Sequence, residues 1–198
     1  GKKYPNRYRC CKSVLTNPTI HAMAHHETHL LSTSRFDVVE IPADPANPTG
    51  KQRQIVRHPG AVTILPMVDD FHVCLIRNYR VSVAEELFEL PAGTLEPNEP
   101  HAVTAERELI EETGYRADKL VHLHSFYLSP GILDEHMHLY IATGLTEGEA
   151  EREQGELITN FVVSWETAQE MVRERKICDA KSITGILMYD QIKRSGEL

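Results

Sequence analysis

The sequence predicts a mixed α/β (α+β) fold in which a mixed β-sheet is sandwiched between helices and is preceded by a small N-terminal β-hairpin domain. Short β-type segments recur from residue 36 to residue 165. Helical patterns are few, with one after residue 98 and two near the end of the chain. The 198 residues are 41% hydrophobic and 25% charged, which is enough apolar material for a buried core.

The N-terminal part divides into an arm and a small β region. Residues 1–28 are polar and lack periodicity, so we expect an arm there. Residues 36–41 (FDVVEI) and 53–58 (RQIVRH) have the pattern of two strands on either side of a turn rich in Pro, Gly and Asn. We therefore expect a small β region over residues 29–58 and the main domain over residues 59–198.

The main domain begins with strands. Residues 60–68 form a nearly continuous apolar run, which is typical of a central strand. We expect further strands over residues 71–80, 87–93, 120–129, 136–145 and 158–165. Amphipathic patterns predict two closing helices, over residues 166–177 and 182–194.

A third helix is expected between the strands, ending before Gly114. Asn98 or Glu99 is placed to cap the helix, Pro100 suits a first helical turn, and Gly114 suits a left-handed C-terminal cap. One side is small to apolar, and we expect the glutamates of the helix to lie off that side. The core side consists of Ala102, Ala105, Leu109 and Thr113.

Composition and charge exclude several classes of protein. The net charge of −8 argues against binding to nucleic acid or to an anionic membrane through phosphate attraction. The four cysteines form no CxxC pair, which favours reduced thiols and a cytoplasmic location. No apolar run approaches the roughly 18 residues of a membrane helix.

The central helix carries an unusual concentration of negative charge. Glu106, Glu108, Glu111 and Glu112 crowd two turns, with Arg107 as the nearby cation. Like charges four residues apart cost a helix roughly 0.2–0.5 kcal/mol per pair. An ordinary solvated face is one explanation of the cluster. The other is a divalent cation such as Mg²⁺, which prefers oxygen ligands and is recruited together with substrate phosphates.

The spacing around these glutamates resembles the signature of a known family. Gly93, Glu99 and the run RELIEETGY (107–115) match every fixed position of the Nudix box. The chain is therefore similar to the Nudix hydrolases, and the resemblance implies the Nudix fold with the box as a loop–helix–loop.

The resemblance also implies roles for individual residues. Glu108 and Glu112 match the family's metal-binding pair, and Glu111 is expected to join them directly or through water. Arg107 is expected to orient the glutamates through salt bridges. The carbonyl of Ala92 matches a backbone ligand of the metal, which is expected to be Mg²⁺, with Mn²⁺ as the alternative.

Features outside the box resemble the ADP-ribose pyrophosphatases of this family. Pro130 lies 16 residues beyond Gly114, like the proline that marks that subfamily. Arg80 matches an arginine that contacts substrate phosphates, and a planar charged fork suits that role. Glu156, with Glu153 in reserve, matches the general base on the loop after the box. These residues are expected to cleave ADP-ribose to AMP and ribose 5-phosphate.

The resemblance leaves several alternatives open. The substrate is a nucleotide sugar, but ADP-glucose or GDP-mannose would use the same catalytic box. A module that senses ADP-ribose without cleaving it is less favoured, because the carboxylates of the box are intact. The hairpin over residues 36–58 resembles the region through which the subfamily forms homodimers, often by exchanging that region between chains.

Overall fold

The computed structural model describes residues 27–152 and 157–196, and the chain divides into two compact units between Arg57 and His58. Most of the expected N-terminal arm, residues 1–26, lies outside the described residues. No helix in the described part of the chain is long and apolar enough to cross a membrane.

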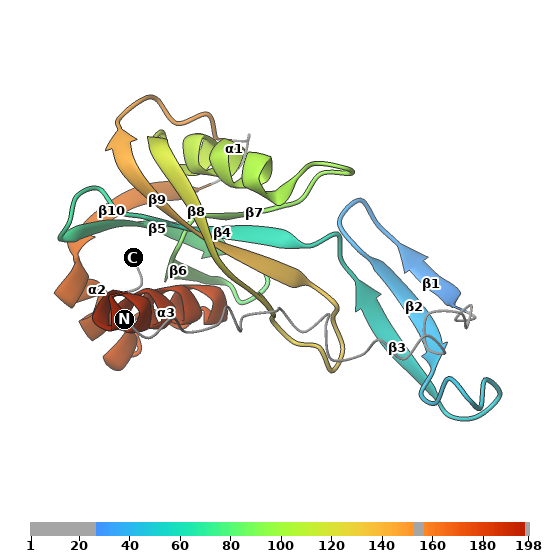
Figure 1. Ribbon diagram of the computed structural model, residues 1–198. Coiled ribbons are helices and arrows are strands. Elements are labelled where there is room, and N and C mark those ends of the chain that lie inside the picture. The colour runs from blue at the N-terminus through green and yellow to red at the C-terminus, as the bar shows by residue number, and fades with distance from the viewer. Residues whose placement is uncertain (1–26, 153–156, 197–198) are drawn as a thin grey trace, which may run out of the picture. The chain divides into compact units, whose positions relative to one another are not determined.

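The first unit is a three-stranded antiparallel sheet (Figure 1). Its strands, in spatial order, are β1 (Thr28–Ser32), β2 (Asp37–Pro42) and β3 (Gln52–Arg57). The pair β2–β3 confirms the predicted hairpin. Strand β1 was not predicted, because all five of its side chains are exposed and no apolar alternation marks it.

The second unit contains two sheets and three helices. A four-stranded sheet has the order β7-β4-β9-β8 and a three-stranded sheet has the order β10-β5-β6. Strands β4 and β9 pair in parallel and the other pairs are antiparallel, so the predicted mixed sheet is confirmed. The strands are β4 (Ala61–Pro66), β5 (His72–Arg80), β6 (Glu85–Glu89), β7 (Ala92–Thr94), β8 (Arg116–Tyr127), β9 (His136–Thr146) and β10 (Ile158–Ser164).

The helices cover both faces of these strands, which confirms the predicted layers. Figure 1 shows α1 (His101–Thr113) on one side, and α2 (Trp165–Arg173) and α3 (Ala180–Ser195) on the other. Strand β4 is fully buried between them, as expected for a central strand. Its Ile64 packs in a cluster with Leu109 of α1, whereas Leu65 packs in a cluster with Ile186 of α3. Alternate residues of β4 therefore serve two cores.

Helix α1 differs from the prediction at its start and in its apolar stripe. Pro100 is the N-cap and no side chain caps the helix, so the assignment of Asn98 or Glu99 as cap was wrong. Ala102 is exposed, and Thr104 is buried instead. The remaining stripe of Ala105, Leu109 and Thr113 is buried as predicted. Gly114 closes the helix with φ 79°, which confirms the left-handed cap.

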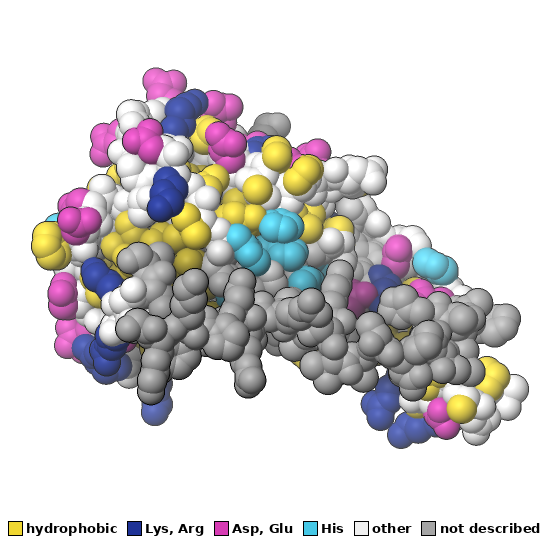
Figure 2. Space-filling model, in the orientation of Figure 1, with side chains coloured by type: hydrophobic (Ala, Val, Ile, Leu, Met, Phe, Trp, Pro, Cys, Tyr) yellow, Lys and Arg dark blue, Asp and Glu magenta, His cyan; other side chains and the backbone are white. Residues whose placement is uncertain are grey.

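A cluster of histidines lies where α1 begins over β8 and β9. Figure 2 shows histidine side chains gathered on this face. The rings of His101 and His138 stack with centroids 4.2 Å apart, and His101 Nδ1 is hydrogen-bonded to the Tyr140 hydroxyl. Ser125 Oγ lies 2.8 Å from both His138 Nδ1 and His122 Nε2. Burial, together with the nearby His101, His136 and His122, lowers the pKa of His138 from 6.5 to about 4.

Acid should therefore destabilise this region. Because the pKa of His138 is lower in the folded chain, the unfolded chain binds more protons as the pH falls from 6.5 toward 4, and the free energy of unfolding decreases over that window. We expect His138→Asn to reduce the difference in Tm between about pH 7 and about pH 5. His29→Asn, in the other unit, is the matched control. An unchanged pH dependence of Tm in His138→Asn would contradict this prediction.

Candidate active site

Two glutamates of α1 converge on the turn that opens β7. Glu112 Oε2 accepts a hydrogen bond of 2.9 Å from the backbone N–H of Ala92. The Glu108 carboxylate lies so close to Gly93 that a Cβ there would fall 1.8 Å from its Cδ. Glycine at position 93 therefore lets the Glu108 carboxylate approach the backbone, and a larger residue there would displace that carboxylate. The structure therefore brings Glu108 and Glu112 together at the Ala92–Gly93 backbone.

Glu112 is more buried than the sequence indicated. The expectation that all glutamates of the helix lie off the core side was wrong for this residue, which is 5% exposed. Its bond to Ala92 explains how the helix can bury a carboxylate, because a backbone N–H replaces part of the lost hydration. Glu106, by contrast, is exposed.

Arg107 holds three carboxylates in one arrangement. Its Nη2 donates to Glu99 Oε2 at 3.1 Å, and its Nη1 donates to Glu108 Oε1 at 2.7 Å and Glu111 Oε2 at 2.9 Å. The hydrogen bonds with Glu99, and further Glu108 and Glu111, raise the pKa of Arg107 against the effect of its burial. The Arg107 bond is also the main cause that lowers the pKa of Glu99. This cation offsets the repulsion that the crowded glutamates would otherwise suffer.

The donor set at this turn fits a hard divalent cation. No group of three or more His, Cys, Asp or Glu side chains within residues 27–152 and 157–196 is arranged to hold a metal ion by itself. Two carboxylates, Glu108 and Glu112, lie instead at the Ala92–Gly93 backbone. Carboxylate and carbonyl oxygens are the ligands that Mg²⁺ and Mn²⁺ prefer, and Mg²⁺ commonly uses few protein ligands beside substrate phosphates.

The remaining predicted site residues are Arg80, Pro130, Glu156 and Glu153. Arg80 makes a two-pronged ion pair with Glu89, through Nε at 2.8 Å and Nη2 at 2.5 Å. Pro130 is exposed in the connection between β8 and β9, and no contact described for the site carboxylates involves it. Glu156 and its reserve Glu153 lie outside the described residues.

Several polar residues at the site were missed by the sequence analysis. Arg152 Nε donates to the carbonyl of Glu112 at 3.1 Å, and Asn160 Nδ2 donates to that of Thr113 at 2.7 Å. These side chains satisfy carbonyls at the end of α1. A second group, at the start of α3, consists of Asp179, Lys181 and Ser182. The pattern of an aspartate three residues before a serine indicates a helix cap, but not a link to the active site.

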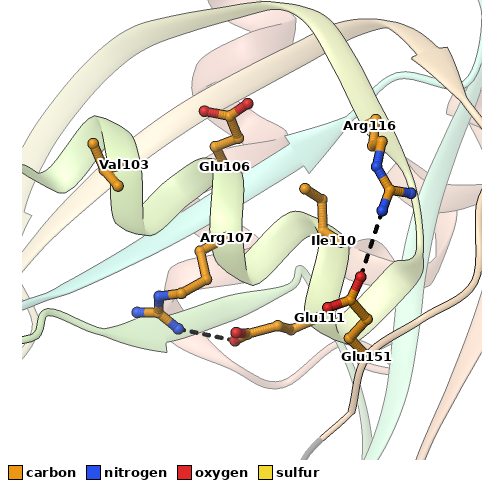
Figure 3. Close-up of a pocket in the computed structure, with 7 residues that line it drawn as sticks. All are labelled: Val103, Glu106, Arg107, Ile110, Glu111, Arg116 and Glu151. Atoms are coloured by element: carbon orange, nitrogen blue, oxygen red, sulfur yellow. Dashed lines mark hydrogen bonds and ion pairs between the residues drawn. The ribbon is translucent and has the colours of Figure 1, made fainter.

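A surface cavity of about 310 Å³ adjoins the site along the outer side of α1. Figure 3 shows two ion pairs across it, from Arg107 to Glu111 at 2.9 Å and from Arg116 to Glu151 at 3.5 Å. The cavity shares Arg107 and Glu111 with the site. Glu108 and Glu112 do not line it, so it borders the candidate metal ligands rather than containing them.

Comparisons with known proteins find similar sequences and a similar fold. The NUDIX domain family matches residues 57–183. A Bacillus subtilis (strain 168) protein named ADP-ribose pyrophosphatase is 38% identical over 159 residues, covering 79% of this chain and 83% of the relative. A Bacillus methanolicus protein named methanol dehydrogenase activator is 37% identical over 163 residues, covering 81% and 85%. A crystal structure of an ADP compounds hydrolase shares the fold with a TM-score of 0.69 at 24% identity, covering 87% of this chain and 97% of that one.

Proposed function

This chain belongs to the NUDIX family, and from that premise we propose that it hydrolyses the diphosphate bond of ADP-ribose to AMP and ribose 5-phosphate. The observation that carries the proposal is the convergence of Glu108 and Glu112 on the Ala92–Gly93 turn. A relative named ADP-ribose pyrophosphatase, similar over most of both chains, supports this choice of substrate.

The residues that would hold the metal are Glu108, Glu112 and the carbonyl of Ala92. Mg²⁺, or Mn²⁺ in its place, supplies polarisation of the diphosphate and shielding of its charge when bound. Glu112 is kept in place by Ala92 N–H, and Glu108 by Arg107. Both carboxylates are thus oriented before any ligand arrives, which reduces the cost of ordering them.

Other residues would bind the substrate and accept the proton of the attacking water. We assign Arg80 to the substrate phosphates and Glu111 to a supporting role beside the metal ligands. Glu156, with Glu153 in reserve, would accept the proton of the attacking water. Pro130 would lie against the substrate from the β8–β9 connection. Water would attack one phosphorus as the bond from that phosphorus to the bridging oxygen breaks, and Arg80 would balance part of the charge on the phosphate group that leaves.

We propose that two chains form a homodimer through the small β region, residues 29–58, and that they can exchange this region. The catalytic unit would span residues 59–198. We also propose a cytoplasmic location, supported by the free thiols of Cys74 and Cys178 among the described residues. The net charge of −8 supports the absence of a nucleic-acid or membrane partner.

Hydrolysis of a nucleotide-sugar panel tests the function. ADP-ribose, ADP-glucose and GDP-mannose are each incubated with the chain and Mg²⁺, with and without EDTA, and the products are identified. We expect AMP and ribose 5-phosphate from ADP-ribose, well ahead of the other substrates, and no product with EDTA. Faster hydrolysis of another member of the panel would identify that nucleotide sugar as the preferred substrate. Binding without cleavage of any member would identify a sensor instead of an enzyme.

A further inference from the structure

Glu89, the last residue of β6, is the centre of a buried charge network. Its side chain is 1% exposed and receives three hydrogen bonds. Two come from Arg80, and the third, at 2.5 Å, comes from Lys181 Nζ in the first turn of α3. A carboxylate so completely removed from water requires such partners. Glu89 therefore accepts hydrogen bonds both from Arg80, the proposed phosphate contact, and from Lys181, whose helix comes much later in the sequence.

Lys181 completes a neutral set of four charges. Its Nζ also donates to Asp179 Oδ2 at 2.9 Å, and its side chain is 7% exposed. Burial raises the pKa of Asp179, but the charge and hydrogen bond of Lys181 and the bonds from Ser182 outweigh burial and leave that pKa below its ordinary value. Two cations, Arg80 and Lys181, thus balance the anions Glu89 and Asp179. A helix cap alone does not require a lysine to be buried in this way.

Ser182 ties α3 directly to the segment that precedes the metal-binding turn. Its Oγ donates to Asp179 Oδ2 at 2.5 Å and accepts a 2.7 Å bond from the backbone N–H of Leu90. The next carbonyl, Pro91 O, accepts from Ile64 N at 2.9 Å, and Ala92 N donates to Glu112. Leu90, Pro91 and Ala92 are therefore each held through a backbone group, by α3, β4 and α1 respectively.

We propose that Lys181 and Ser182 are positioning residues for the reaction: Ser182 fixes the Leu90–Ala92 segment, and Lys181, through Glu89, sets the orientation and net charge around Arg80. This inference rests on the proposed function, because Ala92 and Arg80 are its candidate metal and phosphate contacts. Arg80 Nε and Nη2 are occupied by Glu89, and Nη1 has no hydrogen-bond partner within the described residues. Lys181 shares Glu89, so it limits how strongly Glu89 neutralises Arg80.

Substitutions of Lys181 and Ser182 should cause different kinetic defects. Lys181→Met removes one positive charge beside Arg80, so we expect the KM for ADP-ribose to rise more than kcat falls. Ser182→Ala releases Leu90 N–H, so we expect a lower kcat, a weaker apparent affinity for Mn²⁺ and faster hydrogen exchange of the Leu90 amide. A displacement of about 1 Å at a reacting centre can cost on the order of a hundredfold in rate. We therefore expect kcat/KM to fall roughly ten- to a hundredfold in each variant.

The experiment compares these variants with Lys181→Arg and with Lys193→Met, an exposed lysine on the same helix. Kinetics with ADP-ribose, Mn²⁺ titration followed by electron paramagnetic resonance, Leu90 amide exchange and Tm are measured for each. Lys181→Arg keeps the charge and should recover most of the wild-type KM, and Lys193→Met should behave as wild type. A lower Tm with unchanged kcat, KM, Mn²⁺ affinity and Leu90 exchange would overturn the inference and leave the network purely structural.

Two further outcomes keep the test decisive. If Lys181→Met does not fold, Ser182→Ala decides, because it removes a single hydroxyl. If wild-type protein does not cleave ADP-ribose, the proposed function fails. The Mn²⁺ titration and the Leu90 amide exchange then still show whether Ser182 positions the turn. Failure of the proposed function can therefore be distinguished from failure of the positioning role.

Discussion

Glu112→Gln is expected to reduce turnover of ADP-ribose by at least about a hundredfold, which is the upper end of what residues that merely support a metal ligand cost. The amide keeps the shape of the side chain, and its oxygen can still accept the Ala92 N–H that Glu112 accepts at 2.9 Å. The negative charge that would bind the cation is lost. Turnover and the concentration of Mg²⁺ that gives half-maximal rate are the measurements.

The same substitution should not unfold the metal-free chain. Glu112 is 5% exposed, and glutamine keeps both the size of this buried side chain and an oxygen that can accept the Ala92 N–H. We therefore expect Tm without metal to change little in Glu112→Gln, and stabilisation by added Mg²⁺ to be lost. Glu106→Gln, on the exposed side of the same helix, should keep wild-type turnover. Equal turnover in both variants would reject the metal-ligand assignment.

The sequence could predict the contacts that arise within α1 and its flanking turns. Glu108 and Glu112 share a helix face because they are four residues apart, and Gly114 ends the helix because only glycine readily adopts its φ of 79°. The chemistry of the acidic cluster was also accessible, because its spacing matches a long family signature. These features need no knowledge of which strand lies beside the helix.

Features that depend on distant parts of the chain were missed. The burial of Glu112 depends on a backbone N–H 20 residues earlier, and that partner cannot be read from the helix pattern. Residues 87–93 were predicted as one strand, but β6 pairs with β5 and β7 pairs with β4, so the segment divides between two sheets. Pro91 lies at the break, where it lacks the N–H that a continuing ladder would need.

The network around Glu89 shows the same limit most clearly. Lys181 and Leu90 each find their partners 92 residues away, at Glu89 and Ser182 respectively. In the sequence, Asp179 and Ser182 indicate only a helix cap, and Lys181 is one charge among many. The packing of α3 against the strands makes these residues neighbours of the active site, and no local pattern encodes that packing.

Arg80→Lys is expected to raise the KM for ADP-ribose about ten- to a hundredfold, because one charge-assisted hydrogen bond is worth roughly 1.5–3 kcal/mol. The guanidinium engages Glu89 through two nitrogens, and Nη1, which has no hydrogen-bond partner within the described residues, would bind the phosphate. A lysine cannot do both with one ammonium group. The pairing with Glu89 raises the pKa of Arg80 despite its partial burial, so the side chain is a permanent cation. Steady-state kinetics measure the effect.

Arg77→Lys is the matched control for this substitution. Arg77 lies on the same strand, β5, and is half exposed beside Glu86 with a nitrogen–oxygen distance of 3.7 Å, so its replacement should leave KM unchanged. Thermal shifts by ADP-ribose without metal separate binding from turnover, and the shift should be reduced only in Arg80→Lys. If Arg80→Lys lowers Tm but binds ADP-ribose as well as wild type, Arg80 serves the buried network alone and the phosphate contact must lie elsewhere.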